Sequence, residues 1–252
     1  MQKVGIVKDN IFLNHCAPYE HPENPERLLA IHQMLSYDKN LKDLIPIQLK
    51  KASKEEIELV HTPSYVDLIE DTSKRDFSVL DGDTYASKAT FETALLAAGS
   101  TVSVVEKVFK GELNSAFSFV RPPGHHSEKD KAMGFCIFNN IAIAAKYALQ
   151  NLGAKKIAII DFDLHHGNGT QNAFYDTDQV LYISIHQFPY YPGTGSIAEI
   201  GIDKGEGFNI NIPFPAGYGD PEYMKVTREI IKPVVLKYKP DILLLSAGFH
   251  RN

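Results

Sequence analysis

Residues 161–169 read Asp161-Phe-Asp-Leu-His-His-Gly-Asn-Gly169, directly after the apolar run 156–160. That run is β-branched and predicts a buried strand. Charged groups at the end of a buried strand are normally paired or bind a metal, because burying them unpaired is costly. Side chains two apart in an extended segment share a face, which predicts Asp161, Asp163 and His165 on one side and His166 on the other. Carboxylate and imidazole groups on one face are suitable zinc ligands.

A second polar cluster follows another predicted strand, at 115–120. It reads Arg121-Pro-Pro-Gly-His-His126. Two prolines fix the backbone there, and Gly124 permits a turn or a close approach. After such a turn, His125 and His126 could both face one pocket, which adjacent residues of a regular strand could not do. Imidazoles titrate near neutral pH and therefore suit acid–base chemistry beside a metal.

Strand-like and helix-like patterns alternate along the whole chain. We predict strands at 4–7, 115–120, 156–160, 179–185, 208–212 and 241–247, and helices at 25–35, 54–60, 64–70, 87–109, 138–150, 170–175 and 220–238. This alternation predicts an α/β fold, with a mostly parallel sheet and helices on both faces. Ligands of such sheets bind at the carboxyl edge of the strands, where both polar clusters fall.

Composition narrows the function classes. The 252 residues are 44% hydrophobic, which suits one large domain over residues 1–252. The formal charge is −5 and there is no run of Lys and Arg, so direct nucleic-acid binding is not expected. No apolar segment suggests a signal peptide or a membrane span. Cys16 and Cys136 form no CxxC motif, which favours a reduced, cytoplasmic protein.

Together these motifs resemble the zinc-dependent histone deacetylases, whose superfamily includes the bacterial acetoin-utilization proteins and acetylpolyamine amidohydrolases. The matching segments are Arg121-Pro-Pro-Gly-His-His126, Gly134-Phe-Cys-Ile-Phe-Asn-Asn140, 161–170, His21-Pro-Glu-Asn-Pro-Glu-Arg27, Asp83-Thr-Tyr85, Ser184-Ile-His-Gln187, Tyr191-Pro-Gly-Thr-Gly195, Asn209-Ile-Asn-Ile-Pro213 and Ser246-Ala-Gly-Phe249. They follow the family's order over nearly the whole chain. Asn168 resembles the class II pattern. The resemblance implies the arginase–deacetylase fold.

The resemblance also implies roles for the polar clusters. Asp163 and His165 would bind one catalytic Zn²⁺; for an isolated motif, the alternative would be a structural Asp–His pair. Asp161 would orient His125, and Asn168 would orient His126, although Asn168 between two glycines also suits a turn. A carboxylate stabilises an imidazolium better than an amide does. We therefore predict a protonated His125, and a neutral His126 that acts as general base and then acid.

The same resemblance implies a substrate tunnel. Gly134 and Phe135 would form one wall and Tyr191 the other, around the stem of an acyl-lysine; ordinary core packing is the alternative for these aromatics. Asp83 matches a rim position that holds the substrate backbone, but Asp-Thr is also a common helix start. A structural K⁺ would bind carbonyls of Asp161, Asp163 and His165, with the side chains of Asp163 and Ser184. We treat His15, His21, His61 and His186 as structural.

The chain departs from the family's pattern near residue 250. The family's third zinc ligand is an Asp directly after Ser-Ala-Gly-Phe, and here that position is His250. The family's later loop, with the tyrosine that polarises the substrate carbonyl, has no match. We therefore expect the C-terminal part of the fold to be missing, with His250 as a candidate third ligand. Loss of such an oxyanion donor typically lowers the rate by about 10²–10³-fold.

The predicted function is hydrolysis of the amide of an acetyl-lysine peptide or acetylpolyamine by a metal-activated water. Two alternatives remain open. One is a catalytically impaired deacetylase relative that binds acyl-lysine ligands. The other is a two-manganese ureohydrolase, although that family needs a further Asp where this chain has Asn168. The sequence does not define an oligomeric state.

Overall fold

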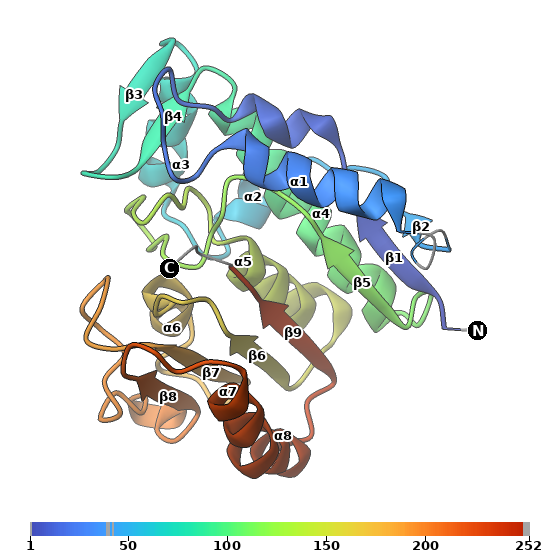
Figure 1. Ribbon diagram of the computed structural model, residues 1–252, viewed down its shortest axis with the longest axis vertical. Coiled ribbons are helices and arrows are strands. Elements are labelled where there is room, and N and C mark those ends of the chain that lie inside the picture. Colours follow the sequence, from blue (N-terminus) through green and yellow to red (C-terminus); the bar gives the residue numbers. More distant parts are fainter. Residues whose placement is uncertain (1, 39–40, 42, 249–252) are drawn as a thin grey trace. The chain divides into compact units, whose positions relative to one another are not determined.

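The computed structural model describes residues 2–38, 41 and 43–248, which divide into two compact units (Figure 1). The first unit is Met1–Leu152 and the second is Gly153–Asn252. Each unit has its own parallel sheet and its own apolar cluster. The α/β class predicted from the alternating pattern is confirmed. That the whole chain acts as one deacetylase-like domain stays a prediction.

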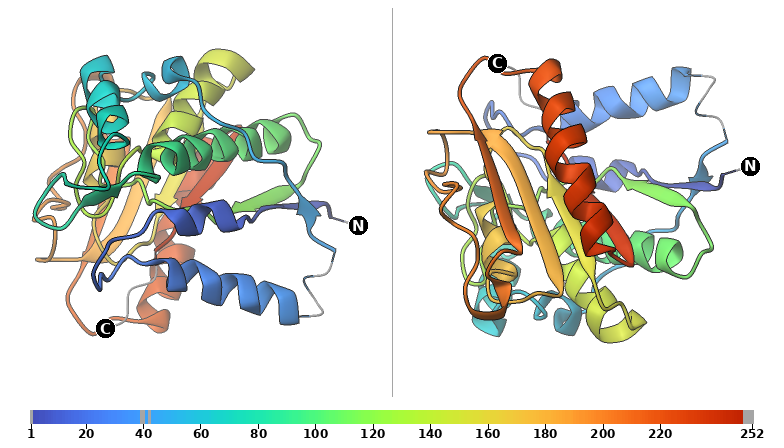
Figure 2. Two further views of the ribbon diagram at one scale, coloured as in Figure 1. Left: turned by 90° about the horizontal axis from the view of Figure 1, so that it is seen from above. Right: turned by 90° about the horizontal axis from the view of Figure 1, so that it is seen from below.

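The sheet of the first unit has three short parallel strands in the order β2 (Ile45–Pro46), β1 (Val4–Val7) and β5 (Ser115–Ser118). The helices of this unit are η1 (Asn10–Asn14), α1 (Pro25–Tyr37), α2 (Lys54–Ile57), α3 (Pro63–Thr72), α4 (Thr90–Phe109) and α5 (Asn140–Tyr147) with the π turn η3 (Ala148–Leu152). Helices α1 and α4 lie on opposite sides of the sheet (Figure 2). Strand β5 leads directly into the loop that carries the tandem histidines.

A two-stranded antiparallel hairpin also belongs to the first unit. It pairs β3 (Phe77–Val79) with β4 (Tyr85–Ser87). The sequence pattern did not predict it, because strands of three residues are too short to show a period. Asp83 lies in the hairpin loop, and α4 begins only at Thr90. The alternative interpretation of Asp83-Thr84 as a helix start is therefore wrong.

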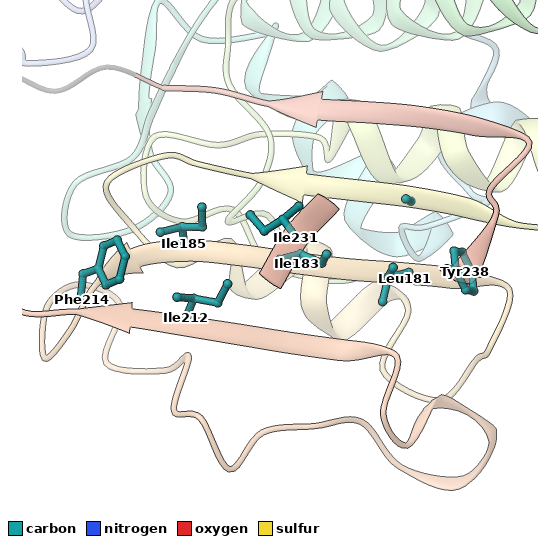
Figure 3. Packing of buried hydrophobic residues seen from close by; sticks show 8 residues of the cluster. Leu181, Ile183, Ile185, Ile212, Phe214, Ile231 and Tyr238 are labelled. Carbon is teal, nitrogen blue, oxygen red and sulfur yellow. The ribbon is translucent and has the colours of Figure 1, made fainter. Parts of the chain in front are cut away.

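The second unit is built on four parallel strands in the order β8 (Asn209–Phe214), β7 (Val180–Gln187), β6 (Ile157–Asp161) and β9 (Ile242–Ser246). Strand β6 is central, and its last residue Asp161 pairs with Ser184 of β7 and Ser246 of β9. Polar side chains of three strands thus reach one edge of the sheet. One face of the sheet carries the apolar cluster drawn in Figure 3: Ala158, Leu181, Ile183, Ile185, Ile212, Phe214, Ile231 and Tyr238.

The helix predicted over 220–238 covers this apolar face, but it is not uniform. It consists of α7 (Asp220–Val226), the π turn η5 (Thr227–Ile231) and α8 (Lys232–Tyr238). Pro233 explains the change, because proline removes a helix hydrogen bond and clashes with the preceding turn. Helix α6 (Asn168–Ala173) follows β6 more closely than the predicted 170–175, and η4 (Asp203–Gly205) precedes β8. Over the part of the chain that the structure describes, no helix is long and apolar enough to cross a membrane.

Candidate active site

The tandem-histidine loop, residues 121–139, is held by bonds from segments far away in the sequence. At its start, the Arg121 guanidinium binds both carboxylate oxygens of Glu23, with Nη2 to Oε2 at 2.6 Å, and donates to the Phe12 carbonyl at 3.0 Å. Arg121 and Glu23 are both buried. At its end, the backbone N–H of Asn139 donates to His61 Nε2 at 2.9 Å. The loop therefore has a fixed course without regular secondary structure.

This course brings the two tandem histidines side by side. The ring centroids of His125 and His126 lie 4.0 Å apart, and both side chains are buried. Gly124 is required beside them, because a Cβ there would lie 2.5 Å from the Phe138 carbonyl oxygen. The backbone N–H of His126 donates to Cys136 Sγ at 3.4 Å. Two adjacent imidazoles on one side of the loop are thus available for proton transfer.

Phe135, the predicted tunnel wall, lies at the tip of a tight turn in the same loop. Its φ of 70° and the φ of 55° at Gly134 are both left-handed. A Cβ on Gly134 would lie 2.3 Å from His126 Cδ2, so only glycine fits against that ring. The Asp83 carboxylate accepts a hydrogen bond from the Gly134 N–H at 3.2 Å. Asp83 thus has a structural partner in addition to any role at a substrate rim.

Three of the four histidines predicted to be structural, His15, His21 and His61, are buried in the first unit, and His186 is buried in the second. His15 stacks on Tyr85 and its Nδ1 lies 2.8 Å from Thr90 Oγ1. Burial, helped by the charge of Arg121, lowers the pKa of His15 to about 3. Burial also lowers the pKa of His61 to about 4, against the opposing effect of its backbone hydrogen bonds. Both rings are neutral at pH 7 and serve as hydrogen-bonding spacers.

In the second unit, the predicted metal-binding loop follows β6 directly. Asp161 is fully buried; its Oδ1 accepts the Asp163 N–H at 3.2 Å, and its Oδ2 accepts the Tyr182 hydroxyl at 3.3 Å. Burial next to Asp161 raises the pKa of Tyr182, so its hydroxyl stays a donor. Asp163 Oδ1 in turn accepts the His165 N–H at 2.8 Å. Asp161 and Asp163 therefore each accept the backbone N–H two residues ahead, and these two hydrogen bonds turn the loop back on itself.

This folding brings the two predicted metal ligands together. His165 Nδ1 lies 3.4 Å from Asp163 Oδ1. The His165 ring stacks on Tyr190 with centroids 5.2 Å apart and meets Tyr191 edge-on at 5.7 Å. Tyr191 therefore contacts a predicted ligand, which core packing alone does not require. The chemistry of this donor pair fits zinc.

Two ligands do not complete a catalytic zinc site, which needs three protein groups. Within residues 2–38, 41 and 43–248, no group of three or more His, Cys, Asp or Glu side chains is arranged to hold a metal ion. The candidate third ligand, His250, lies outside the described residues. At Gly248, the last residue that the structure describes, a Cβ would lie only 1.7 Å from Asp163 Oδ2. The backbone at Gly248 therefore lies directly against the Asp163 carboxylate.

His166 points away from His165, into a buried polar network that sequence reasoning missed. Its Nδ1 lies 2.8 Å from Thr194 Oγ1 and its Nε2 lies 3.0 Å from Gln171 Oε1. The Gln171 oxygen also accepts from Asn209 at 2.9 Å and from Asn211 at 2.8 Å. Alternating polar residues in the buried strands β7 and β8 were the available signal, since Tyr182, Ser184, His186, Asn209 and Asn211 share the sheet face opposite the apolar cluster.

This network positions the loop that carries the tyrosines. Gln171 Nε2 donates to Glu199 at 2.6 Å, and Glu199 accepts the backbone N–H of Ser196 at 2.9 Å. His186 Nε2 lies 2.9 Å from the carbonyl oxygen of Gly195. Asn168 is the first residue of α6 and is buried, as a positioned side chain requires. The predicted pairs Asp161–His125 and Asn168–His126 each join residues of different units and stay predictions.

Comparison with known proteins agrees with these motifs. A family model for the histone deacetylase domain matches residues 21–251. A protein of Archaeoglobus fulgidus named "Probable deacetylase" is 44% identical over 246 residues, which cover 97% of this chain and 68% of that protein. "Histone deacetylase 5" of Arabidopsis thaliana is 41% identical, over 98% of this chain but 40% of the relative's length.

A solved structure gives the same result for the fold. The structure titled "Crystal Structure of HDA15 HD domain" matches with a TM-score of 0.94 and 38% sequence identity, and the match covers 98% of this chain and 72% of that one. The predicted arginase–deacetylase α/β fold is confirmed. By its motifs, its fold and the family model that it matches, the chain belongs to the histone deacetylase family.

Proposed function

We propose that this protein is a zinc-dependent amidohydrolase that removes acetyl or related acyl groups from lysine side chains or polyamines. The observation that carries the proposal is the pair of adjacent buried imidazoles, His125 and His126, whose centroids lie 4.0 Å apart. Membership of the histone deacetylase family supports the reaction class. Burial suits proton transfer, because bulk water does not compete for the proton.

Zinc would be held by Asp163 and His165, with His250 as the candidate third ligand. When bound, zinc polarises the substrate carbonyl and lowers the pKa of the attacking water. The 3.4 Å contact between Asp163 and His165 supports this assignment, because it places an oxygen and a nitrogen donor together. A structural K⁺ at the carbonyls of Asp161, Asp163 and His165, with Ser184, belongs to the same proposal.

The tandem histidines divide the proton chemistry. We assign His126 as the neutral base that takes a proton from the attacking water and then gives it to the leaving amine. His125, with the Asp161 carboxylate as its predicted partner, would stay protonated and stabilise negative charge on the substrate oxygen. Asn168 would be the neutral partner that leaves His126 able to accept a proton.

The acyl-lysine stem would lie between the rings of Phe135 and Tyr191. Gly134 leaves room on the His126 side, and Asp83 would contact the substrate backbone at the rim. The expected partners are therefore an acetylated peptide or an acetylpolyamine, without direct nucleic-acid binding. A cytoplasmic location stays a prediction from the sequence.

The test is acetate release from an acetyl-lysine peptide and from an acetylpolyamine, with zinc supplied and with a chelator. His126→Ala should lower kcat by about 10²–10⁴-fold, the usual contribution of a general acid–base. The matched control is His32→Gln, a buried histidine of α1 whose ring bonds Asn10 at 3.2 Å.

Three outcomes contradict parts of the proposal in different ways. Turnover that a chelator does not abolish would exclude zinc. Tight acyl-lysine binding without turnover would favour an impaired deacetylase that acts as a binding protein. Two manganese ions per chain with ureohydrolase activity would overturn the substrate class.

A further inference from the structure

The turn at Met133–Cys136 has an unusual conformation for its sequence. The Cys136 N–H donates to the Met133 carbonyl at 2.9 Å, which closes a four-residue β-turn. Both central residues have positive φ, 55° at Gly134 and 70° at Phe135. Such a type I′ turn favours Asn and Gly at its centre, and a bulky aromatic residue there is strained. Something outside the turn must therefore stabilise Phe135 in this conformation.

The β3–β4 hairpin supplies that stabilisation. The N–H groups of the two central residues have no partner inside a β-turn. Here the Gly134 N–H donates to Asp83 Oδ1 at 3.2 Å and the Phe135 N–H donates to Thr84 Oγ1 at 2.9 Å. The Thr84 hydroxyl gives its own proton to Asp83 Oδ1 at 2.8 Å, which leaves its lone pairs for Phe135. Consecutive hairpin side chains thus satisfy both turn amides.

The hairpin loop that provides these acceptors is itself fixed. The Leu80 N–H donates to the Thr84 carbonyl at 2.9 Å. His21 Nε2 lies 3.1 Å from the Asp83 carbonyl oxygen, and the His21 ring meets the Phe135 ring edge-on with centroids 5.0 Å apart. Thr84 is only 2% exposed, so water is a poor substitute for its hydroxyl.

The same turn also touches the proposed base. The missing Cβ of Gly134 leaves space that the His126 ring fills, since a Cβ would lie 2.3 Å from Cδ2. A change in the turn would therefore move Phe135 and disturb the packing of His126. The hydrogen-bond acceptors of the hairpin, Asp83 and Thr84, therefore affect both the position of Phe135 and the packing of His126.

We propose that Thr84 is a positioning residue: its hydroxyl holds Phe135 in the left-handed conformation in which the ring forms one wall of the acyl-lysine site. This inference rests on the proposed function for its effect on substrate, but not for its effect on the turn. Thr84 acts only through Phe135. It needs no contact with substrate.

The experiment compares Thr84→Val, which keeps the side-chain shape and removes the hydroxyl, with Thr84→Ser, which keeps the hydroxyl. Backbone amide exchange of Phe135, measured by NMR, should accelerate at least tenfold in Thr84→Val and stay near the wild-type rate in Thr84→Ser. KM for an acetyl-lysine peptide should rise about tenfold, the ratio that one lost buried hydrogen bond gives, with a smaller change in kcat.

A double-mutant cycle separates positioning from general destabilisation. In a Phe135→Gly background, glycine takes a φ of 70° without strain and has no ring to place. Thr84→Val should then leave KM unchanged. If Thr84→Val raises KM equally in both backgrounds, or lowers only the melting temperature, the proposal is wrong.

Two further arms keep the result decisive. If Thr84→Val does not fold, Asp83→Ala removes the other acceptor, and the exchange of the Gly134 amide gives the same test. If the wild-type protein shows no turnover, a fluorescent acetyl-lysine peptide reports affinity in place of KM. Fast exchange without any loss of affinity would then show that the turn is positioned by the hairpin but does not form the proposed wall.

Discussion

The loop at 161–168 leaves a regular strand, whereas the loop at 121–139 has hardly any regular structure of its own. The first is shaped by its own carboxylates, with Asp161 and Asp163 each accepting an N–H two residues ahead. The second depends on Glu23, His61 and the β3–β4 hairpin, all distant in the sequence. A loop held mainly by its own hydrogen bonds tolerates most substitutions elsewhere in the chain. A loop held by hydrogen bonds and ion pairs from distant segments can be destabilised by substitutions at several distant positions.

The strongest test of this difference is the buried ion pair at the start of the tandem-histidine loop. Glu23→Gln leaves the Arg121 guanidinium buried without a counter-charge, which should lower the free energy of unfolding by about 3–5 kcal/mol. Urea unfolding measures it. The control is Glu92→Gln on the half-exposed Lys51–Glu92 pair, where the loss should stay below about 1 kcal/mol. Equal losses in the two variants would contradict the argument.

One position outside the predicted metal-binding loop is an exception to its local support, because its backbone lies against the Asp163 carboxylate. Gly248→Ala places a Cβ where Asp163 Oδ2 now lies, 1.7 Å away. Zinc affinity should fall by about 100-fold, at the upper end for groups that position a ligand. Competition with a chromophoric chelator measures it. Gly219→Ala is the control, since a Cβ there meets nothing within 4 Å; unchanged affinity in Gly248→Ala would disprove the close approach.

The polar network of the second unit allows a smaller test. Gln171→Met leaves His166, Asn209 and Asn211 without their shared acceptor, which should cost about 1–3 kcal/mol of stability. Thermal unfolding measures it, with exposed Gln179→Met as the control. A neutral result would mean that these side chains find other partners.

The pH dependence of stability should identify the buried histidines of the first unit. The folded pKa values of His15 and His61 are about 3 and about 4, below the value near 6.5 in the unfolded chain. The unfolded state therefore binds more protons than the folded state. The stability that these two neutral rings contribute is fully present above pH 6.5 and is lost as the pH drops. Each ring should contribute a slope of about 1.4 kcal/mol per pH unit between about pH 6 and pH 4.5.

Urea unfolding at several pH values gives this slope directly. His61→Gln should remove the contribution of one titrating ring from this slope, about 1.4 kcal/mol per pH unit. His61 Nε2 accepts the Asn139 N–H only when unprotonated, so acid should loosen the tandem-histidine loop first. An identical slope in wild type and His61→Gln would contradict the assignment.

The sequence by itself determined the α/β class, most of the elements and the family, because strand and helix periods and strand-end motifs are local properties of the chain. It also predicted that the side chains of Asp163 and His165 lie together, since the two residues are only two positions apart in the chain. It did not predict the β3–β4 hairpin, the π turn before Pro233, or the network around Gln171.

Only the tertiary structure decided how the tandem-histidine loop is held. Arg121 and Glu23 are 98 residues apart, and Thr84 and Phe135 are 51 apart. No local pattern encodes such pairs, because each side chain also suits an ordinary turn or surface. The left-handed conformation of Phe135 is the clearest case: its own sequence disfavours it, and hydrogen bonds from a distant hairpin stabilise it.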